Sequence, residues 1–382
     1  MTIEFASSAR SSLGVEWELA LVDTDSGDLR QVAQTVLDAV APADGSQHPA
    51  IRQELLLNTV EVVSGVCARV PDAMSDLAAG TALVREVTDP LRVELMSAGT
   101  HPFAHWGNQK VTDKARYATL IDRTQWWGRQ MLIYGVHVHV GIEDRDKVLP
   151  ILNALLAYYP HLLALSASSP FWDGRDTGYA SNRALLFQQL PTAGLPFTTI
   201  GSWADLEHYV GDMLHTGVID DFDEIRWDLR PSPKFGTLEM RICDGISNAL
   251  ELGAVAALTH CLVEYLSRLI DAGERLPSIS PWFLAENKWR SARYGLEAIV
   301  ILDEAGTEEL VTDHLLRLLG LLAPVAADLG CVSELDGIRE IIATGGSYQR
   351  QRAVAAGNGG ALDAVVAHLV AEFRAGRPLP PG

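Results

Sequence analysis

The sequence predicts an α+β protein, and two observations support that prediction. Three stretches, residues 11–23, 134–142 and 225–244, alternate polar and apolar positions with the two-residue period of a β-strand. Several segments between them, and most of the chain after about residue 246, place apolar residues at helical spacing instead. No internal repeat, low-complexity linker or shift in composition divides the 382 residues. We therefore expect one domain, residues 1–382, whose C-terminal part is mostly helical.

Composition and charge exclude several classes of function. With 48% hydrophobic residues the chain can bury a sizeable core, and its formal charge of −19 argues against binding to nucleic acid or anionic membranes. The N-terminus lacks the pattern of a signal peptide, and no apolar run reaches transmembrane length. These features predict a cytoplasmic protein that binds neither nucleic acid nor a membrane, and they leave a homo-oligomer open.

The spacing of the cysteines also indicates a cytosolic protein. They are widely spaced, without a Cys-x-x-Cys pair, which is typical of reduced and mostly buried thiols in a cytosolic protein. A catalytic thiol among them stays open as an alternative. The four are Cys67, Cys243, Cys261 and Cys331.

The first predicted strand, residues 11–23, carries a pair of carboxylates. Val15 and Trp17 share one face, and Glu16 and Glu18 share the other. Two adjacent carboxylates repel each other unless a cation lies between them. A solvated strand face is the alternative, although the apolar run at residues 19–22 argues against it. A short helix is expected at residues 33–40.

A second acidic pair follows in residues 52–63. Glu54 and Glu61 are seven positions apart, so one continuous strand would place them on opposite faces. A bend or bulge would be needed to bring them together. Residues 71–96 then show helical periodicity with a break at Pro90, and residues 99–104 are expected to form an ordinary loop.

The stretch at residues 134–142 alternates two histidines with valines. His137 and His139 project to one face of the predicted strand, and the valines fit a half-buried opposite face. Neutral imidazoles are common metal ligands, while a pair of hydrogen-bonded histidines is the structural alternative. An apolar helix interrupted by prolines is expected at residues 146–166. Residues 166–183 form a charged, glycine-containing loop that is either functional or braced by its own salt bridges.

Residues 225–244 predict a strand, a turn and a second strand. On the first strand Arg226, Asp228 and Arg230 alternate on one side. On the second strand Thr237, Glu239 and Arg241 alternate on one side. A face with both signs of charge suits a substrate that also carries both, and a cross-strand ladder of salt bridges is the alternative.

The remaining segments are predicted to be mainly helical. We expect a long amphipathic helix at residues 246–272, and a basic stretch at residues 286–293 that either meets phosphate or forms a solvated helix face. Residues 345–352 are expected to be a polar connection before the last helix.

The carboxylates and histidines together indicate a site for several cations. A sheet that gathers them on one face would offer hard oxygen ligands, which magnesium prefers and bridges to phosphates. No thiolate joins them, which disfavours structural zinc. The sequence has no Walker A loop and no dinucleotide-binding glycine motif, so a sheet-based, magnesium-dependent ATP site remains.

Six ordered motifs resemble the type 2 glutamate–cysteine ligase (carboxylate–amine ligase) family. They are Gly14-Val-Glu-Trp-Glu-Leu, Gln53-Glu-Leu-Leu-Leu-Asn-Thr-Val-Glu, Gly99-Thr-His-Pro-Phe-Ala, Gly135-Val-His-Val-His-Val-Gly, Trp227-Asp-Leu-Arg-Pro-Ser-Pro and Gly236-Thr-Leu-Glu-Met-Arg. More distantly, their order is similar to that in glutamine synthetase. The resemblance covers about residues 12–352. It implies a glutamine-synthetase-like catalytic domain, a curved and mostly antiparallel sheet with helices on its outer side.

The resemblance also implies roles for individual residues. His139 matches a position near the ATP phosphates, and Arg241 matches an arginine that faces phosphate or the substrate carboxylate. Glutamine synthetases carry a further arginine where this chain has Thr237. Arg230, Arg290 and Arg293 are therefore candidates for the remaining phosphate contacts. The metal-ligand positions are matched by Glu16, Glu18, Glu54, Glu61, His137 and Glu239.

The implied reaction has two steps. ATP phosphorylates the γ-carboxylate of L-glutamate, with Mg²⁺ or Mn²⁺ as cofactor, and an amine then attacks the acyl phosphate to release phosphate beside the ADP. The resemblance favours L-cysteine as that amine. Three alternatives stay open: a ligase for another amine, a phosphotransferase acting on a carboxylate or guanidine, and a non-catalytic protein that binds metal or nucleotide.

Overall fold

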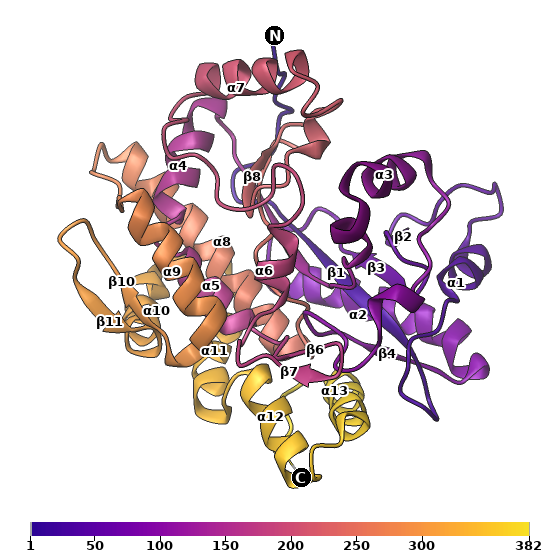
Figure 1. Cartoon of the computed structure of the whole chain (residues 1–382). Helices are drawn as coiled ribbons and strands as arrows, with labels where there is room; N and C mark the ends of the chain where they lie inside the picture. The colour runs from indigo at the N-terminus through magenta and orange to yellow at the C-terminus, as the bar shows by residue number, and fades with distance from the viewer. Residues whose placement is uncertain (1, 382) are drawn as a thin grey trace.

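The computed structural model describes residues 2–381 and has a seven-stranded antiparallel sheet at its centre (Figure 1). The strands run in the order β2-β3-β1-β5-β9-β8, with β4 paired to the far part of β1. Their bounds are β1 (Leu13–Asp23), β2 (Ile51–Gln53), β3 (Thr59–Val63), β4 (Val93–Met96), β5 (Val136–Gly141), β8 (Leu229–Ser232) and β9 (Thr237–Met240). Two small hairpins are formed by β6 (Phe171–Trp172) with β7 (Arg175–Asp176), and by β10 (Ile299–Ile301) with β11 (Glu308–Leu310).

Helices fill the intervals and most of the C-terminal part, so the predicted α+β class is confirmed. They are α1 (Ala33–Val40), α2 (Val70–Thr88), α3 (Ala115–Arg129), α4 (Val148–Leu155), α5 (Tyr159–Ser166), α6 (Arg183–Phe187), α7 (Trp203–His215), α8 (Ala249–Asp271), α9 (Pro281–Tyr294), α10 (Val311–Leu329), α11 (Val332–Thr344), α12 (Ser347–Gly357) and α13 (Leu362–Ala375). Single 3₁₀ turns occupy residues 89–91, 106–108, 145–147, 222–224 and 295–297.

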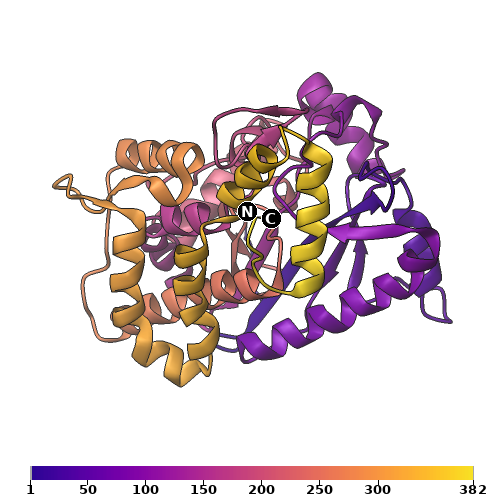
Figure 2. The same ribbon diagram turned by 90° about the horizontal axis from the view of Figure 1, so that it is seen from below.

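The sheet has one apolar face and one polar face. Trp17 of β1, Val62 of β3 and Val138 of β5 belong to a large buried core that also takes in residues of α2, α4 and α8. Figure 2 shows α2 running along this side of the strands. Because side chains alternate along a strand, the neighbouring positions of β1 and β5 turn their charged side chains to the other face.

Helix α8 is buried along almost its whole length rather than amphipathic. It packs against α4, α5, α10 and α11, which cover the sides that would otherwise meet water. By length and composition α8 could also span a membrane, but 83% of its apolar window is buried inside the fold. Burial in the core therefore accounts for its hydrophobicity.

Several segments differ from the sequence-based expectation in a way that matters for the site. Residues 52–63 form the hairpin β2–β3, and Glu54 lies in its turn, so of the expected bend or bulge it is a bend that brings Glu54 beside Glu61. Of the residues expected to be helical, 71–96, only those up to Thr88 belong to helix α2, and the last four form strand β4 of the sheet. The expected helix at residues 146–166 is two helices, α4 and α5, at an angle of 66°.

Two further expectations were wrong. Asp228 does not share a face with Arg230, because β8 begins only at residue 229. The carboxylate of Asp228 instead turns to the helices, where it accepts hydrogen bonds from Tyr159 at 2.8 Å and Lys288 at 2.7 Å. Residues 347–352 belong to α12 and are not a polar connection. In that helix Arg350 is buried between Glu251 of α8 and Glu372 of α13.

Candidate active site

A cleft of about 1050 Å³ opens on the polar face of the sheet. The carboxylates and histidines that the sequence motifs match to metal or phosphate positions all line it, and so do Arg230 and Arg241. The matched residues are Glu16, Glu18, Glu54, Glu61, His137, His139 and Glu239. The antiparallel register brings them together, because it sets Glu16 opposite His137, Glu18 opposite Glu61, and His139 opposite Glu239.

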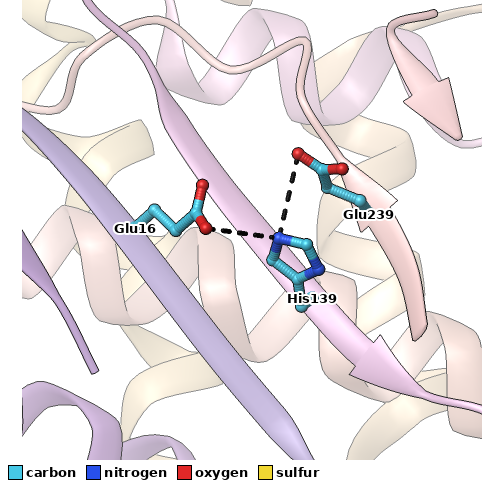
Figure 3. A group of neighbouring side chains, drawn as sticks. All are labelled: Glu16, His139 and Glu239. Carbon is cyan, nitrogen blue, oxygen red and sulfur yellow. Dashed lines mark ion pairs between the residues drawn. The ribbon is translucent and has the colours of Figure 1, made fainter. Parts of the chain in front are cut away.

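Three neighbouring strands meet in the middle of the cleft (Figure 3). His139 on β5 lies between Glu16 on β1 and Glu239 on β9, with its Nε2 3.5 Å from a Glu16 oxygen and 3.8 Å from a Glu239 oxygen. The other ring nitrogen, Nδ1, is 2.9 Å from the hydroxyl of Thr237. Thr237 therefore fixes the orientation of the His139 ring.

His137 has one engaged nitrogen and one free nitrogen. Its Nδ1 lies 2.9 Å from Glu16, while its Nε2 is buried and has no hydrogen-bond partner within residues 2–381. Burial and the charge of Arg241 lower the pKa of His137 to about 4, so the ring is neutral at physiological pH. A neutral, buried imidazole with an unused nitrogen is suited to metal ligation.

The ligand atoms form three overlapping groups, each with its atoms within 4.8 Å of one another. Glu16 belongs to the first two groups, and Glu61 belongs to the last two. The groups are Glu16–His139–Glu239, Glu16–Glu61–His137 and Glu18–Glu54–Glu61. Because neighbouring groups share a carboxylate, cations held by them would lie next to one another along the sheet.

The carboxylates of the cleft differ in their electrostatic surroundings. Burial and the Glu54 charge raise the pKa of Glu18 to about 8. Burial likewise raises the pKa of Glu54, and burial together with the charge of Glu16 raises that of Glu61. These three carboxyl groups therefore lie together without enough positive charge nearby to keep all of them ionised.

Glu239 is balanced by arginines. Burial works against its ionisation, but the charges of Arg230 and Arg241 outweigh burial and hold the pKa of Glu239 well below its usual range. Arg230 donates to Glu239 at 2.7 Å, and Arg241 donates to the other carboxylate oxygen. Glu239 is thus ionised and fixed, with two guanidinium groups beside it in the cleft.

Sequence reasoning missed several cations that also line the cleft. Arg52 directly precedes the Gln-Glu motif of the second acidic pair, and Lys234 lies in the turn between β8 and β9. Lys114 and Arg116 stand at the start of α3. The sequence indicated Lys234 weakly, because it lies in the Pro-Ser-Pro-Lys-Phe-Gly turn between two predicted strands. No sequence pattern indicated that the α3 residues line the cleft.

The charged loop at residues 166–183 brings a further cation, Arg183, to the cleft. The loop is held by the buried carboxylate of Asp244, which accepts hydrogen bonds from the Ser169 hydroxyl at 2.6 Å and the Ser181 hydroxyl at 2.7 Å. Arg183 donates to the backbone carbonyls of Arg241 and Ile242 at the end of β9. The loop is therefore braced mainly by hydrogen bonds, and it positions a residue of the cleft.

The structure does not bring Arg290 and Arg293 to the cleft. Arg290 on α9 donates to Glu286 at 2.8 Å and also pairs with Glu308 on β11. Arg293 donates to the carbonyl of Gly178 and lies over the ring of Tyr294. Both guanidinium groups thus have other partners and do not line the cleft. No cysteine lines the cleft among the residues that the structure describes.

Comparison with known proteins identifies close relatives. The family described as "Glutamate-cysteine ligase family 2" matches residues 12–368. "Putative glutamate--cysteine ligase 2-1" of Arthrobacter sp. (strain FB24) is 61% identical over 381 residues, covering 98% of this chain and 99% of the relative. "Putative glutamate--cysteine ligase 2" of Mycobacterium tuberculosis (strain ATCC 25177 / H37Ra) is 58% identical over 371 residues, covering 97% of each chain.

Solved structures share the fold at low sequence identity. A glutamate–cysteine ligase of Francisella tularensis, solved in complex with AMP, has a TM-score of 0.71 at 12% identity and covers 97% of this chain and 90% of its own. A bifunctional glutathione synthetase of Pasteurella multocida has a TM-score of 0.66 at 15% identity, covering 96% of this chain and 52% of its own. At these identities the likeness concerns the fold, and it confirms the architecture implied by the sequence motifs.

Proposed function

The chain belongs to glutamate–cysteine ligase family 2, and on that premise we propose that it is an ATP-dependent ligase joining the γ-carboxyl of L-glutamate to an amine. The observation that carries the proposal is the row of three overlapping carboxylate–imidazole groups in a cleft lined by arginines. Such a site can hold cations beside a polyphosphate and a carboxylate substrate at the same time.

The residues fit divalent ions such as Mg²⁺ or Mn²⁺. Glu16, Glu18, Glu54, Glu61 and Glu239 supply hard oxygen atoms, and His137 supplies a buried nitrogen without another partner. The raised pKa values of the crowded carboxylates are what a site built for extra positive charge would show in its absence. Bound divalent ions would screen the charge that develops on the transferred phosphoryl group.

The first step transfers the γ-phosphoryl group of ATP to a γ-carboxylate oxygen of glutamate and releases ADP. Arg230 and Arg241 hold fixed positive charge beside Glu239, where negative charge accumulates on the equatorial oxygens. The Arg241 guanidinium also suits an α-carboxylate, which prefers two parallel hydrogen bonds. Holding the α-carboxylate leaves the γ-carboxyl to react.

In the second step the amine nitrogen bonds to the acyl carbon as inorganic phosphate leaves, and the nitrogen gives up a proton. The product is then a γ-glutamyl amide. We propose L-cysteine as the acceptor on the strength of the family, which gives γ-glutamylcysteine, ADP and phosphate.

The direct test incubates the purified protein with L-glutamate, ATP, Mg²⁺ and L-cysteine. Nucleotide products are separated by chromatography, and the linkage of the amide is determined by mass spectrometry of the dipeptide. Hydroxylamine in place of cysteine provides a probe for the first step, because it converts an acyl phosphate to a hydroxamate regardless of the natural amine.

The outcomes separate the alternatives. An α-linked dipeptide, or AMP as the nucleotide product, would refute the mechanism. Phosphorylated product that never yields an amide with any amine would identify a phosphotransferase. Faster turnover with another amine would keep the mechanism and replace cysteine as the acceptor.

A further inference from the structure

Arg241 lies just beyond the end of a strand, and both of its backbone polar groups are held by residues outside the strands. Regular pairing of β9 with β5 and β8 stops at Met240. The Arg241 N–H donates to the carbonyl of Asp228 at 2.8 Å, and the Arg241 carbonyl accepts from Nη1 of Arg183 at 3.1 Å. These two contacts fix the backbone from which the Arg241 side chain extends into the cleft.

Asp228 is itself held by a buried ion pair. Its Oδ2 accepts from Nζ of Lys288 at 2.7 Å and from the hydroxyl of Tyr159 at 2.8 Å. The two donors come from α9 and α5, helices that pack against each other (Figure 1). The Lys288 side chain is 7% exposed and that of Asp228 only 1%, and neither residue lines the cleft. The ion pair therefore influences the site only through the backbone.

Stability alone does not account for this ion pair. Burial removes both charges from water, and Oδ1 of Asp228 is buried without a hydrogen-bond partner within residues 2–381. An apolar pair of similar volume would carry no such desolvation cost. What the charges add is a fixed position for the Asp228 carboxylate, and with it a fixed position for the carbonyl that accepts from Arg241.

Arg183 holds the other side of Arg241. Its Nη1 donates to the carbonyls of Arg241 and Ile242, and its guanidinium lies 5.5 Å from the centre of the Phe187 ring. A Cβ on Gly135 would lie 2.2 Å from Nη2 of Arg183, so glycine there leaves room for the guanidinium against the chain that enters β5. A lysine at position 183 would keep the charge but lack this flat shape.

We propose that Asp228, Lys288 and Arg183 are positioning residues for Arg241. Each acts through the Arg241 backbone rather than on the reacting atoms, and together they hold its guanidinium in one orientation toward the substrate. The inference rests on the proposed function, in which Arg241 holds the α-carboxylate of glutamate.

The expected size of the effect follows from the geometry of that contact. A bidentate contact between a guanidinium and a carboxylate depends on direction as well as distance. A misplacement of about 1 Å in an active site can lower the rate by about 100-fold. Loss of either hold on Arg241 should therefore lower kcat/KM for glutamate by roughly 10- to 100-fold, mainly through KM, and leave KM for ATP within about two-fold.

The test compares two variants with a reference. Lys288→Met and Arg183→Lys each remove one hold and keep most of the side-chain volume, and Arg241→Lys is the reference. KM values for glutamate and ATP are measured by hydroxamate formation. Binding of L-glutamate is measured by calorimetry with Mg²⁺ and a non-hydrolysable ATP analogue. Both variants should repeat the pattern of the reference, with raised KM and Kd for glutamate.

Stability measurements separate positioning from a structural role. Lys288→Met leaves Asp228 as an unpaired buried charge and should lower the free energy of unfolding. The double variant Asp228→Asn/Lys288→Met removes both charges, so it should regain stability without regaining the wild-type KM for glutamate. Glu251→Gln is the control, because it breaks a buried ion pair with Arg350 outside the cleft. It should lose stability and keep every kinetic constant per folded molecule.

A double-mutant cycle tests the path through Arg241. In the presence of Arg241→Lys, adding Lys288→Met should lower kcat/KM by less than about three-fold, because the contact that Lys288 positions is already lost. Losses that multiply in full would show that Lys288 acts independently of Arg241 and would overturn the proposal. A wild-type KM for glutamate in the charge-free double variant would overturn it as well, because the ion pair would then only stabilise the fold.

Calorimetry distinguishes failure of this inference from failure of the proposed function. Absence of hydroxamate with the wild type would refute the ligase function. Glutamate binding still tests the positioning in that case, since unchanged affinity in both Lys288→Met and Arg183→Lys would overturn it. A wild type that binds no glutamate would overturn the two proposals together.

Discussion

Replacing Glu239 by glutamine would remove one negative charge from the middle of the cleft and keep the size of the side chain. The Glu239 side chain is only 2% exposed, and it contacts Arg230 at 2.7 Å as well as Arg241. Water therefore screens this charge poorly, and its loss changes the field at the reacting groups directly.

The expected effect on catalysis is large. Losing one fixed electrostatic contact in an enzyme site typically lowers kcat by about 10²–10³-fold, or about 3–4 kcal/mol of barrier. The effect on stability should be smaller, about 1–3 kcal/mol, because glutamine keeps an oxygen that accepts from one arginine while its NH2 group faces the donor of the other. Glu16, which stays ionised beside His137 and His139, also remains to balance the Arg241 charge.

The assay measures kcat for ADP release at saturating substrates, together with the free energy of unfolding in urea. Glu251→Gln is the matched control, because Glu251 also lies in a buried ion pair, 2.9 Å from Arg350, but outside the cleft. That control should lose stability without losing kcat per folded molecule. If Glu239→Gln behaves the same way, then Glu239 is a structural residue and the site assignment is wrong.

Four further outcomes follow from the structure. Glu16→Gln should lower kcat by a similar factor, since Glu16 belongs to two of the three ligand groups, and the same kcat and urea measurements check it. Glutamate-stimulated ADP release should stop in excess chelator and return with Mg²⁺ or Mn²⁺, and full turnover in chelator would exclude the metal site. Replacing any cysteine by alanine or serine should preserve the hydroxamate rate per folded molecule, because no cysteine lines the cleft within residues 2–381. The four cysteines are Cys67, Cys243, Cys261 and Cys331. Inactivation of a folded variant would indicate thiol catalysis. Burial lowers the pKa of His101 to about 4, below its unfolded value of about 6.5, so its contribution of roughly 3 kcal/mol is present above pH 6.5 and lost as pH falls toward 4. The destabilisation measured for His101→Asn by urea unfolding should therefore shrink over that range, and a constant difference would show that His101 is not buried in its neutral form.

Much of the site could be predicted from the sequence because strand alternation is a local property. The two-residue period alone placed Glu16 with Glu18, His137 with His139, and Glu239 with Arg241 on common faces, as the structure has them. The six motifs also predicted the family and the α+β architecture. Strand bounds were less predictable, since β8 begins only after Asp228, whose side chain is held by Tyr159 of α5 and Lys288 of α9.

Only the tertiary structure decided which distant segments meet. Glu54 joins Glu61 because the chain turns back as a hairpin, and Arg183 reaches the cleft because Asp244 anchors its loop. Arg290 looked equally suited to phosphate, yet α9 packs on α5 and β10, and Arg290 pairs with Glu308. The sequence by itself determined the residue types and their local faces, which depend on neighbours one or two positions away. Which of the charged side chains reach the cleft depends on contacts between segments many residues apart, and local spacing does not encode those contacts.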